Sequence, residues 1–478
     1  MRWFRSEGGK LPKNLLAQSF LLGWLVAGFS SSTLATQPNL AGDWPTYGNG
    51  PAHTGYFPGT LNGLPFVLKW KKPLPHAVIS QAAIVGGRVY VSVGYYYSSI
   101  SLWAIDANTG LGLWTNALAG SFSISPPSYD SGSVFIQQDT SVNPSYVWNF
   151  DAVTGHTNWS PTYVSQGYLH MAPVVGGGMV FVDTGYYHGL TGYDEATGGQ
   201  QWFVPLYGSE QWSPAYYNGE VYDWSGSFVE YDPYTGTVNW TLTNGLSGAA
   251  SSRTVTVAGG RAYFTSDSSL YSIDLARHTN AWSISGPFGG TPAMANGLVY
   301  VHSNAFVNAY TTNGDFVRKY DTGLSYETLL GPLIVTDDVL IVAGSYGVYI
   351  FRLADGSVQQ VISSYVSGTG FYYSSTVSLA SNTLYIASSD QNLYAYGAKP
   401  TTPVALTNPA WLGNGTFQFS FTNIPGATFT ALASTNVALP LSNWTSLGIV
   451  TQFSSGQYQF TDFRTTNNPR RFYRISSP

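Results

Sequence analysis

Alternating hydrophobic and polar residues recur along most of the chain, in short runs separated by glycine, asparagine and aspartate. In one copy, "GRVYVSV" (87–93) alternates after a Gly-Gly turn, "SLWAID" (101–106) alternates again, and "LGLW" (111–114) follows another turn. With the short apolar run "SQAAIV" (80–85), this pattern predicts four antiparallel strands. No segment beyond the N-terminal region shows a sustained helical period, so the sequence predicts an all-β fold.

The second strand of this unit can be counted along the chain. It recurs as "VYV" (89–91), "VFI" (134–136), "VFV" (180–182), "VYD" (221–223), "AYF" (262–264), "VYV" (299–301), "LIV" (340–342) and "LYI" (384–386). Four strands repeated about every 40–45 residues are typical of a β-propeller. The sequence therefore predicts an eight-bladed β-propeller of four-stranded blades over residues 66–399.

The last copy ends at 393–399 without a fourth strand, whereas an orphan strand, "FVLKWKKPL" (66–74), precedes the first copy. We expect this N-terminal strand to complete the last blade. Closure of the ring in this way removes the edge strands that an open array would expose.

A second signature marks the turn between the third and fourth strands. An aspartate is followed four residues later by glycine and after four more by tryptophan; the fifth copy keeps only the aspartate and the tryptophan. We predict structural roles: the aspartate bonds turn amides, the glycine takes a left-handed backbone conformation, and the tryptophan packs on the next blade. These positions are Asp106, Gly110, Trp114, Asp151, Gly155, Trp159, Asp194, Gly198, Trp202, Asp232, Gly236, Trp240, Asp274 and Trp282. Arg318 and Gln360 replace the tryptophan in the next two copies, and we expect those blades to pack less tightly.

This repeat resembles the tryptophan-docking repeat of the pyrroloquinoline-quinone-type propellers. That superfamily includes quinoprotein alcohol dehydrogenases and the lipoprotein subunit of the bacterial outer-membrane assembly machine, and "DWPTYGNGPAHTGYFPG" (43–59) is similar to the segment that opens many such propellers. The dehydrogenases of this superfamily hold the quinone beside a vicinal cysteine pair, bind a calcium ion through acidic and amide residues, and use an aspartate base. The resemblance implies the same features for a chain of the dehydrogenase type. This chain has no cysteine, and we cannot match the calcium set residue by residue. The lipidated cysteine of the assembly lipoprotein is also absent.

The N-terminal region has the composition of an export signal. A basic start (Arg2, Arg5), an apolar stretch (15–29) and the small residues that follow predict a signal peptide over 1–35. The alternative is a transmembrane anchor, for which the apolar run is short. Residues 36–65 form a lead-in to the propeller.

The C-terminal region differs from the repeats. A linker rich in proline and threonine spans 400–408, and alternation such as "TFQFSF" predicts a small β-sandwich over 409–478, immunoglobulin- or fibronectin-like. It resembles C-terminal modules appended to secreted bacterial repeat proteins. We therefore expect an exported monomer, either secreted or in the periplasm or cell envelope.

The composition and the motifs of the chain argue against several classes of partner and of catalytic or metal site. Charged residues make up 9% of the chain, and no basic run follows the N-terminal region, which argues against a nucleic-acid partner. The chain contains no G-x-S-x-G, H-E-x-x-H, P-loop or EF-hand motif. Its seven histidines include no i,i+4 pair, so a histidine metal site would have to be assembled across blades. We predict no catalytic residue, no metal site and no cofactor.

One face of the propeller carries the candidate ligand site. Loops between the second and third strands lie on the same face as the links between blades, and in this chain they carry aromatic residues with few charges. Such a surface suits stacking on sugars or capture of an extended peptide; the alternative is that these side chains pack between blades. The candidates are Tyr95, Tyr96, Tyr97, Tyr186, Tyr187, His188, Trp212, Trp224, Tyr372 and Tyr373.

The sequence thus predicts a non-catalytic binding or scaffold protein for a polysaccharide or a protein. Two alternatives remain. One is an oxidoreductase that uses pyrroloquinoline quinone and calcium, and the other is a scaffold for assembly of the cell envelope.

Overall fold

The computed structural model describes residues 42–476, except for 141–143, 166–169, 186, 207–211, 244, 247–253, 267, 325–328, 364, 367–368, 371–375, 400–403, 413–414, 424–426, 464 and 466–469. The predicted signal peptide and the start of the lead-in lie outside the described residues. No described helix is both long enough and apolar enough to cross a membrane.

The described residues of the propeller region form eight antiparallel sheets of four or more strands, numbered here in chain order. Sheet 1 contains β2 (Ala83–Val85), β3 (Arg88–Tyr95), β4 (Ser98–Asp106) and β5 (Gly112–Ala117). Sheet 2 contains β6 (Ser123–Ile124), β7 (Ser128–Asp130), β8 (Ser133–Asp139), β9 (Ser145–Asp151), β10 (Thr157–Trp159) and β11 (Thr162–Tyr163). Sheet 3 contains β12 (Val174–Gly176), β13 (Met179–Asp183), β14 (Gly189–Asp194) and β15 (Gln200–Pro205). Sheet 4 contains β16 (Ala215–Tyr217), β17 (Glu220–Trp224), β18 (Phe228–Tyr231) and β19 (Val238–Leu242).

The remaining sheets continue the same order. Sheet 5 contains β20 (Thr256–Ala258), β21 (Arg261–Thr265), β22 (Ser269–Asp274) and β23 (Thr279–Ser285). Sheet 6 contains β24 (Phe288–Ala295), β25 (Leu298–Ser303), β26 (Phe306–Thr311) and β27 (Phe316–Asp321). Sheet 7 contains β28 (Leu329–Val335), β29 (Val339–Gly344), β30 (Gly347–Arg352) and β31 (Val358–Ser363). Sheet 8 contains β34 (Thr376–Ala380), β35 (Thr383–Ser388), β36 (Asn392–Ala398) and β1 (Phe66–Pro73); the short pair β32 (Tyr365–Val366) and β33 (Thr369–Gly370) lies between sheets 7 and 8 in the chain.

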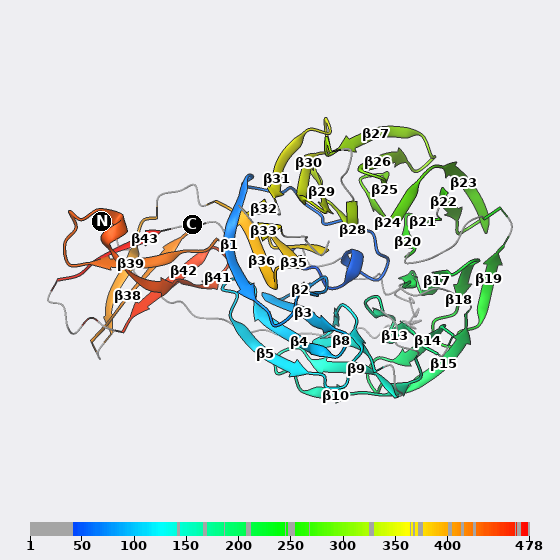
Figure 1. The fold of residues 1–478 in the computed structure, drawn as a ribbon, viewed down its shortest axis with the longest axis horizontal. Helices are drawn as coiled ribbons and strands as arrows, with labels where there is room; N and C mark the ends of the chain where they lie inside the picture. Colours follow the sequence, from blue (N-terminus) through cyan, green and yellow to red (C-terminus); the bar gives the residue numbers. More distant parts are fainter. Residues whose placement is uncertain are drawn as a thin grey trace, which may run out of the picture. The chain divides into compact units, whose positions relative to one another are not determined.

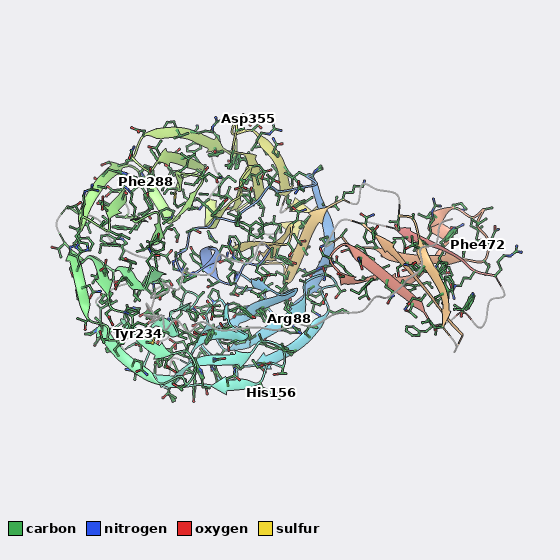
Figure 2. The ribbon with its side chains drawn as sticks, turned by 180° about the vertical axis from the view of Figure 1, so that it is seen from behind. Arg88, His156, Tyr234, Phe288, Asp355 and Phe472 are labelled. Carbon is green, nitrogen blue, oxygen red and sulfur yellow. The ribbon has the colours of Figure 1, made fainter. Side chains whose placement is uncertain are left out.

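The sheets close into a ring. The first strands contact one another in the order β2, β7, β12, β16, β20, β24, β28 and β34, and β34 contacts β2 (Figure 1). Side chains occupy the space between neighbouring sheets around the ring (Figure 2). Strand β1 pairs antiparallel with β36, with Phe66 opposite Ala398 and Pro73 opposite Asn392. The predicted all-β propeller closed by an N-terminal strand is confirmed.

The repeated aspartate, glycine and tryptophan join neighbouring sheets around most of the ring. Asp106 Oδ1 accepts the backbone N–H groups of Asn108 and Thr109 at 3.1 and 2.9 Å. Gly110 has a φ of 72°, and a Cβ placed on it would lie 2.9 Å from the indole of Trp70. A side chain at this glycine would therefore both strain the backbone and displace the docked ring.

The same docking recurs around the ring. Indole Nε1 atoms donate to backbone carbonyls of the next sheet in the pairs Trp114–Ala152 (3.2 Å), Trp159–Glu195 (2.9 Å), Trp202–Pro233 (2.8 Å) and Trp282–Thr312 (2.8 Å). In the fifth copy, His278 replaces the glycine, and its ring stacks on Trp240 with centroids 4.6 Å apart. A flat imidazole thus serves as the docking surface where the sequence lacks glycine.

The lead-in crosses the inner ends of the sheets on one face of the ring. It contains the short helix η1 (Tyr47–Asn49) and lies at the centre of the ring in Figure 1, in dark blue. Its backbone carbonyls accept N–H groups from the first strands of several sheets: Trp44 from Ile84, Pro45 from Tyr129, Pro51 from Tyr216, Ala52 from Val257, Thr54 from Met294 and Gly55 from Val335. The lead-in therefore ties together first strands that lie up to 250 residues apart in the chain and covers the centre of this face.

The C-terminal region forms two further sheets. One contains β37 (Thr407–Leu412), β38 (Thr416–Thr422), β42 (Gln457–Asp462) and β41 (Thr451–Ser454); the other contains β40 (Thr445–Ile449), β39 (Thr430–Ser434) and β43 (Phe472–Ser476). A short helix, η2 (Leu441–Asn443), precedes β40. The hydrophobic core of this C-terminal region contains Phe419, Phe421, Phe429 and Tyr458. The domain boundaries and the immunoglobulin- or fibronectin-like relationship stay predictions.

Candidate functional site

The hairpin turn between β3 and β4 has an unusual backbone. Tyr95 pairs with Ser98, so Tyr96 and Tyr97 alone form the loop. Both have positive φ angles, 55° and 61°. Two-residue hairpin loops favour this geometry, but Asn-Gly is the preferred sequence for it. A left-handed conformation costs a residue with a Cβ roughly 1–2 kcal/mol. Two adjacent tyrosines in this conformation therefore make the turn less stable than an Asn-Gly turn would be.

The turn is fixed against the link between sheets 1 and 2. The backbone N–H of Tyr96 donates to the carbonyl of Phe122 at 2.7 Å, and that of Tyr97 donates to the carbonyl of Ser121 at 3.1 Å. The ring of Phe122 lies 5.4–5.9 Å from the rings of Tyr95, Tyr96 and Tyr97, in edge-to-face contacts. We call Tyr95, Tyr96, Tyr97 and Phe122 the aromatic cluster.

The aromatic cluster is both exposed and neutral. Tyr96 and Tyr97 are 64% and 51% exposed. The segments 89–105 and 107–129, which contain the cluster, carry no charged residue. The cluster lies at the end of β3 opposite the lead-in, because the lead-in bonds near the turn that joins β2 to β3. The hydroxyl of Tyr97 donates to the carbonyl of Thr140 at 3.4 Å. The cluster therefore offers ring faces and the hydroxyl of Tyr96 to a ligand on the face opposite the lead-in.

The other predicted ligand residues that the structure describes differ in their exposure. Tyr187 is 68% exposed, whereas its neighbour His188 is buried, with Nδ1 2.8 Å from Asp183 Oδ2. Trp224 is buried and stacks on Phe264, with centroids 4.5 Å apart, and Trp212 is also buried. The expectation that Trp212 and Trp224 contact ligand is wrong, because both rings are enclosed by packing. Tyr186, Tyr372 and Tyr373 lie outside the described residues.

A buried polar cluster lies beneath this face, at the ends of second strands. His170 Nε2 is 3.4 Å from Asp139 Oδ2, and His170 Nδ1 is 4.0 Å from Asp183 Oδ2. The hydroxyl of Tyr163 is 3.2 Å from His170 Nε2, and burial raises the pKa of Tyr163 well above its ordinary value. All of these side chains are buried, so they hydrogen-bond one another but do not reach a macromolecular ligand.

Asp223 is another buried acid in the same region, and the charge of Asp183 acts on it. Its Oδ2 accepts the hydroxyl of Ser225 at 2.6 Å, whereas its Oδ1 has no hydrogen-bond partner among the described residues. Burial raises the pKa of Asp223 to about 7. This carboxyl group therefore changes its protonation near neutral pH.

The described residues do not fit the calcium set of the quinoproteins. No group of three or more histidine, aspartate or glutamate side chains in the described residues is arranged to hold a metal ion. The oxygens of Asp139 and Asp183 already accept hydrogen bonds from Ser165, His188 and the backbone of Gly189. We derive no chemical step through calcium or a quinone.

Sequence reasoning missed the buried polar cluster. A usable signal was present, because Asp139, Asp183 and Asp223 all fall near the ends of second strands, after "VFIQQ", "VFV" and "VY". Acidic residues at strand positions that are otherwise apolar indicate a polar interior at that level of the ring.

These features define a β-propeller of the pyrroloquinoline-quinone type. The family model described as outer membrane protein assembly factor BamB matches residues 67–173 and 101–320, which together cover more than half of the chain. The chain belongs to this family. No curated protein matches it at a significant level.

Solved structures agree on the fold. BamB from Moraxella catarrhalis is 18% identical, with a TM-score of 0.55 over 70% of this chain and 98% of that one. Quinohemoprotein alcohol dehydrogenase from Comamonas testosteroni is 14% identical, with a TM-score of 0.55 over 77% of this chain and 82% of that one. The computationally designed Ika8 protein is 11% identical, with a TM-score of 0.53 over 69% and 99%. At these identities the likeness shows the fold alone.

Proposed function

We propose that this protein is a non-catalytic binding or scaffold protein that acts outside the cytoplasm. Its aromatic cluster would hold an extended, neutral segment of a polysaccharide or of a partner protein. The observation that carries this proposal is the pair of exposed tyrosines in left-handed backbone conformations. Strained residues persist where the surrounding structure holds them, and they concentrate at functional sites.

The chemistry of the cluster supports a neutral ligand. Tyrosine rings stack on sugar rings and peptide planes, and their hydroxyl groups both donate and accept hydrogen bonds. With no charged residue in the surrounding segments, attraction by ion pairs has little part in binding. Affinity should therefore depend weakly on salt, because screening acts on charges.

Two further observations support an exported binding protein. The N-terminal composition favours export. The matching family is described as an outer membrane assembly factor, which supports a scaffold with a protein partner in the envelope. Testing glycans and peptides side by side in one experiment distinguishes a polysaccharide ligand from a protein ligand.

The test is binding of the full-length mature protein to a glycan array and to an array of extended neutral peptides, at low and high salt. We expect the Tyr96→Ala, Tyr97→Ala double variant to lose binding to the glycan or peptide that the wild-type protein binds. Tyr234→Ala is the matched control, because Tyr234 is 57% exposed in the turn between β18 and β19, on the opposite face. Equal binding by wild type and the double variant would remove the aromatic cluster as the site.

A further inference from the structure

The junction between sheets 6 and 7 lacks the tryptophan docking described above. Arg318 on β27 occupies the position that tryptophan holds in the earlier repeats. Its Cδ lies 3.2 Å from the place where a Cβ on Gly356 would be, so the side chain covers the docking glycine as an indole would. The hydroxyl of Tyr320 donates to the carbonyl of Leu353 at 3.3 Å. This hydrogen bond replaces the one that an indole Nε1 makes at other junctions.

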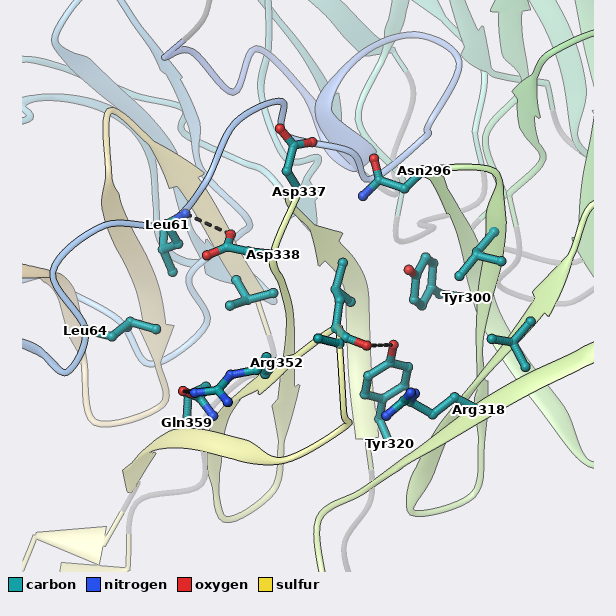
Figure 3. Close-up of a pocket in the computed structure, with 15 residues that line it drawn as sticks. Leu61, Leu64, Asn296, Tyr300, Arg318, Tyr320, Asp337, Asp338, Arg352 and Gln359 are labelled. Atoms are coloured by element: carbon teal, nitrogen blue, oxygen red, sulfur yellow. Dashed lines mark hydrogen bonds between the residues drawn. The ribbon is translucent and has the colours of Figure 1, made fainter.

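A cavity lies beside Arg318, where this repeat has arginine in place of tryptophan. This cavity of about 700 Å³ lies between β27, the start of β29 and the lead-in (Figure 3). Apolar groups from Leu61, Leu64, Leu298 and Val317 line much of it. Its volume falls within the usual range of roughly 300–1,000 Å³ for small-molecule sites.

The charged side chains that line the cavity differ in how many hydrogen bonds and ion pairs they make. Arg352 contacts Asp355 at 3.3 Å and Gln359 at 2.9 Å. Asp338 Oδ1 accepts the N–H of Leu61 at 2.9 Å, and Asp337 accepts Tyr56 and the N–H of Gly59. Arg318, by contrast, makes no hydrogen bond or ion pair with any described residue.

We propose that this cavity binds a small, largely apolar molecule that carries one carboxylate, anchored by the guanidinium of Arg318. A guanidinium presents a planar fork of donors that matches a carboxylate, and the apolar lining matches a hydrocarbon or aromatic body. Asp337 and Asp338 also line the cavity and disfavour a dianion such as a phosphate monoester, because like charges repel. This site lies on the lead-in face and is independent of the aromatic cluster.

The test uses indole-3-acetate as the probe and indole-3-acetamide as its uncharged counterpart, with affinities measured by calorimetry on the full-length mature protein. We expect the acetate to bind at least about tenfold more tightly than the acetamide, since hydrogen bonds to charged groups are the stronger ones. Arg318→Gln should remove this difference. Arg277→Ala is the control, because its side chain is 79% exposed and lies on another sheet.

Arg318→Trp tests the same site without weakening the fold. It restores the residue that fills other junctions, so thermal stability should be maintained while probe binding is lost. Equal affinities for the acetate and the acetamide, or unchanged binding by the folded Arg318→Trp variant, would overturn the proposal. So would an absence of binding by wild type at millimolar probe.

Discussion

The indole Nε1 of Trp70 donates a hydrogen bond of 2.9 Å to the backbone carbonyl of Ala107. Trp70 belongs to the strand that completes sheet 8, and Ala107 follows the third strand of sheet 1. The hydroxyl of Tyr385 donates to the same carbonyl at 3.3 Å. The last and first sheets of the ring are therefore joined by the same docking contact that Trp114, Trp159, Trp202 and Trp282 make elsewhere.

Removing this contact should destabilise the closed ring. Trp70 is 6% exposed, and emptying a buried aromatic site typically costs about 3–5 kcal/mol. We expect Trp70→Ala to lose stability in this range and deletion of 66–73 to cause aggregation, because the edge of β36 would be exposed. Chemical denaturation and size-exclusion chromatography check both. A monomeric deletion variant with the wild-type melting temperature would contradict the closure.

Asp223→Asn should stabilise the protein in alkaline solution. The native pKa of Asp223 is about 7, and its ordinary value is 3.8. Between these values the native state holds the proton more tightly than the unfolded state, so the contribution of Asp223 to stability is lost as pH rises through 7. An amide has no charge to desolvate, so the gain at pH 8 should be up to about 4 kcal/mol and should shrink toward pH 4.

Denaturation of wild type and Asp223→Asn at pH 4, 6 and 8 measures this effect. Asp321→Asn is the control, since Asp321 is exposed and paired with Lys319 at 2.8 Å, and its replacement should give no gain. A constant difference between Asp223→Asn and wild type at all three pH values would contradict titration of Asp223.

His53 should make the lead-in sensitive to acid. Its Nδ1 is 3.1 Å from the carbonyl oxygen of Val255, which immediately precedes the first strand of sheet 5, and burial lowers its pKa from 6.5 to about 4. The unfolded state binds the proton first as pH falls, so stability should drop by roughly 3 kcal/mol between pH 6.5 and 4. His302 has a similarly lowered pKa and adds to the same trend.

The measurement is denaturation in the Asp223→Asn background, because Asp223 titrates over an overlapping range with the opposite sign. His53→Asn should reduce the slope of stability against pH in this window, whatever its effect on stability at pH 8. An unchanged slope would show that His53 is not held neutral by the fold.

Much of the fold could be predicted because its signals are local. Each repeat aspartate bonds the amide three residues on, and Asp106 also bonds the amide two residues on, so the turn is visible in a short window of sequence. Period-two alternation likewise reports strands with one residue facing each way. The lead-in gave no such signal for its position, because its bonds to the first strands run largely through backbone groups, which any sequence supplies.

The candidate site was harder to predict because a loop's place on a face does not fix the depth of its side chains. Tyr96 follows the second strand of sheet 1 and Trp224 ends the second strand of sheet 4, yet Tyr96 is 64% exposed and Trp224 is 2% exposed. The difference comes from packing: Trp224 meets Phe264 of the next sheet, whereas Tyr96 is held outward by a backbone bond to the next link. The sequence alone showed neither contact.

The measurement that tests the central claim most directly is ligand binding by the Tyr96→Asn, Tyr97→Gly variant, with its unfolding free energy as the accompanying control. Asn-Gly suits this turn, so the variant should be at least as stable as wild type, by up to roughly 2–4 kcal/mol if both tyrosines are strained. We predict that this well-folded variant loses the glycan or peptide that wild type binds. Wild-type binding by the stable variant would contradict the account, because the strained tyrosines would then have no part in holding the ligand.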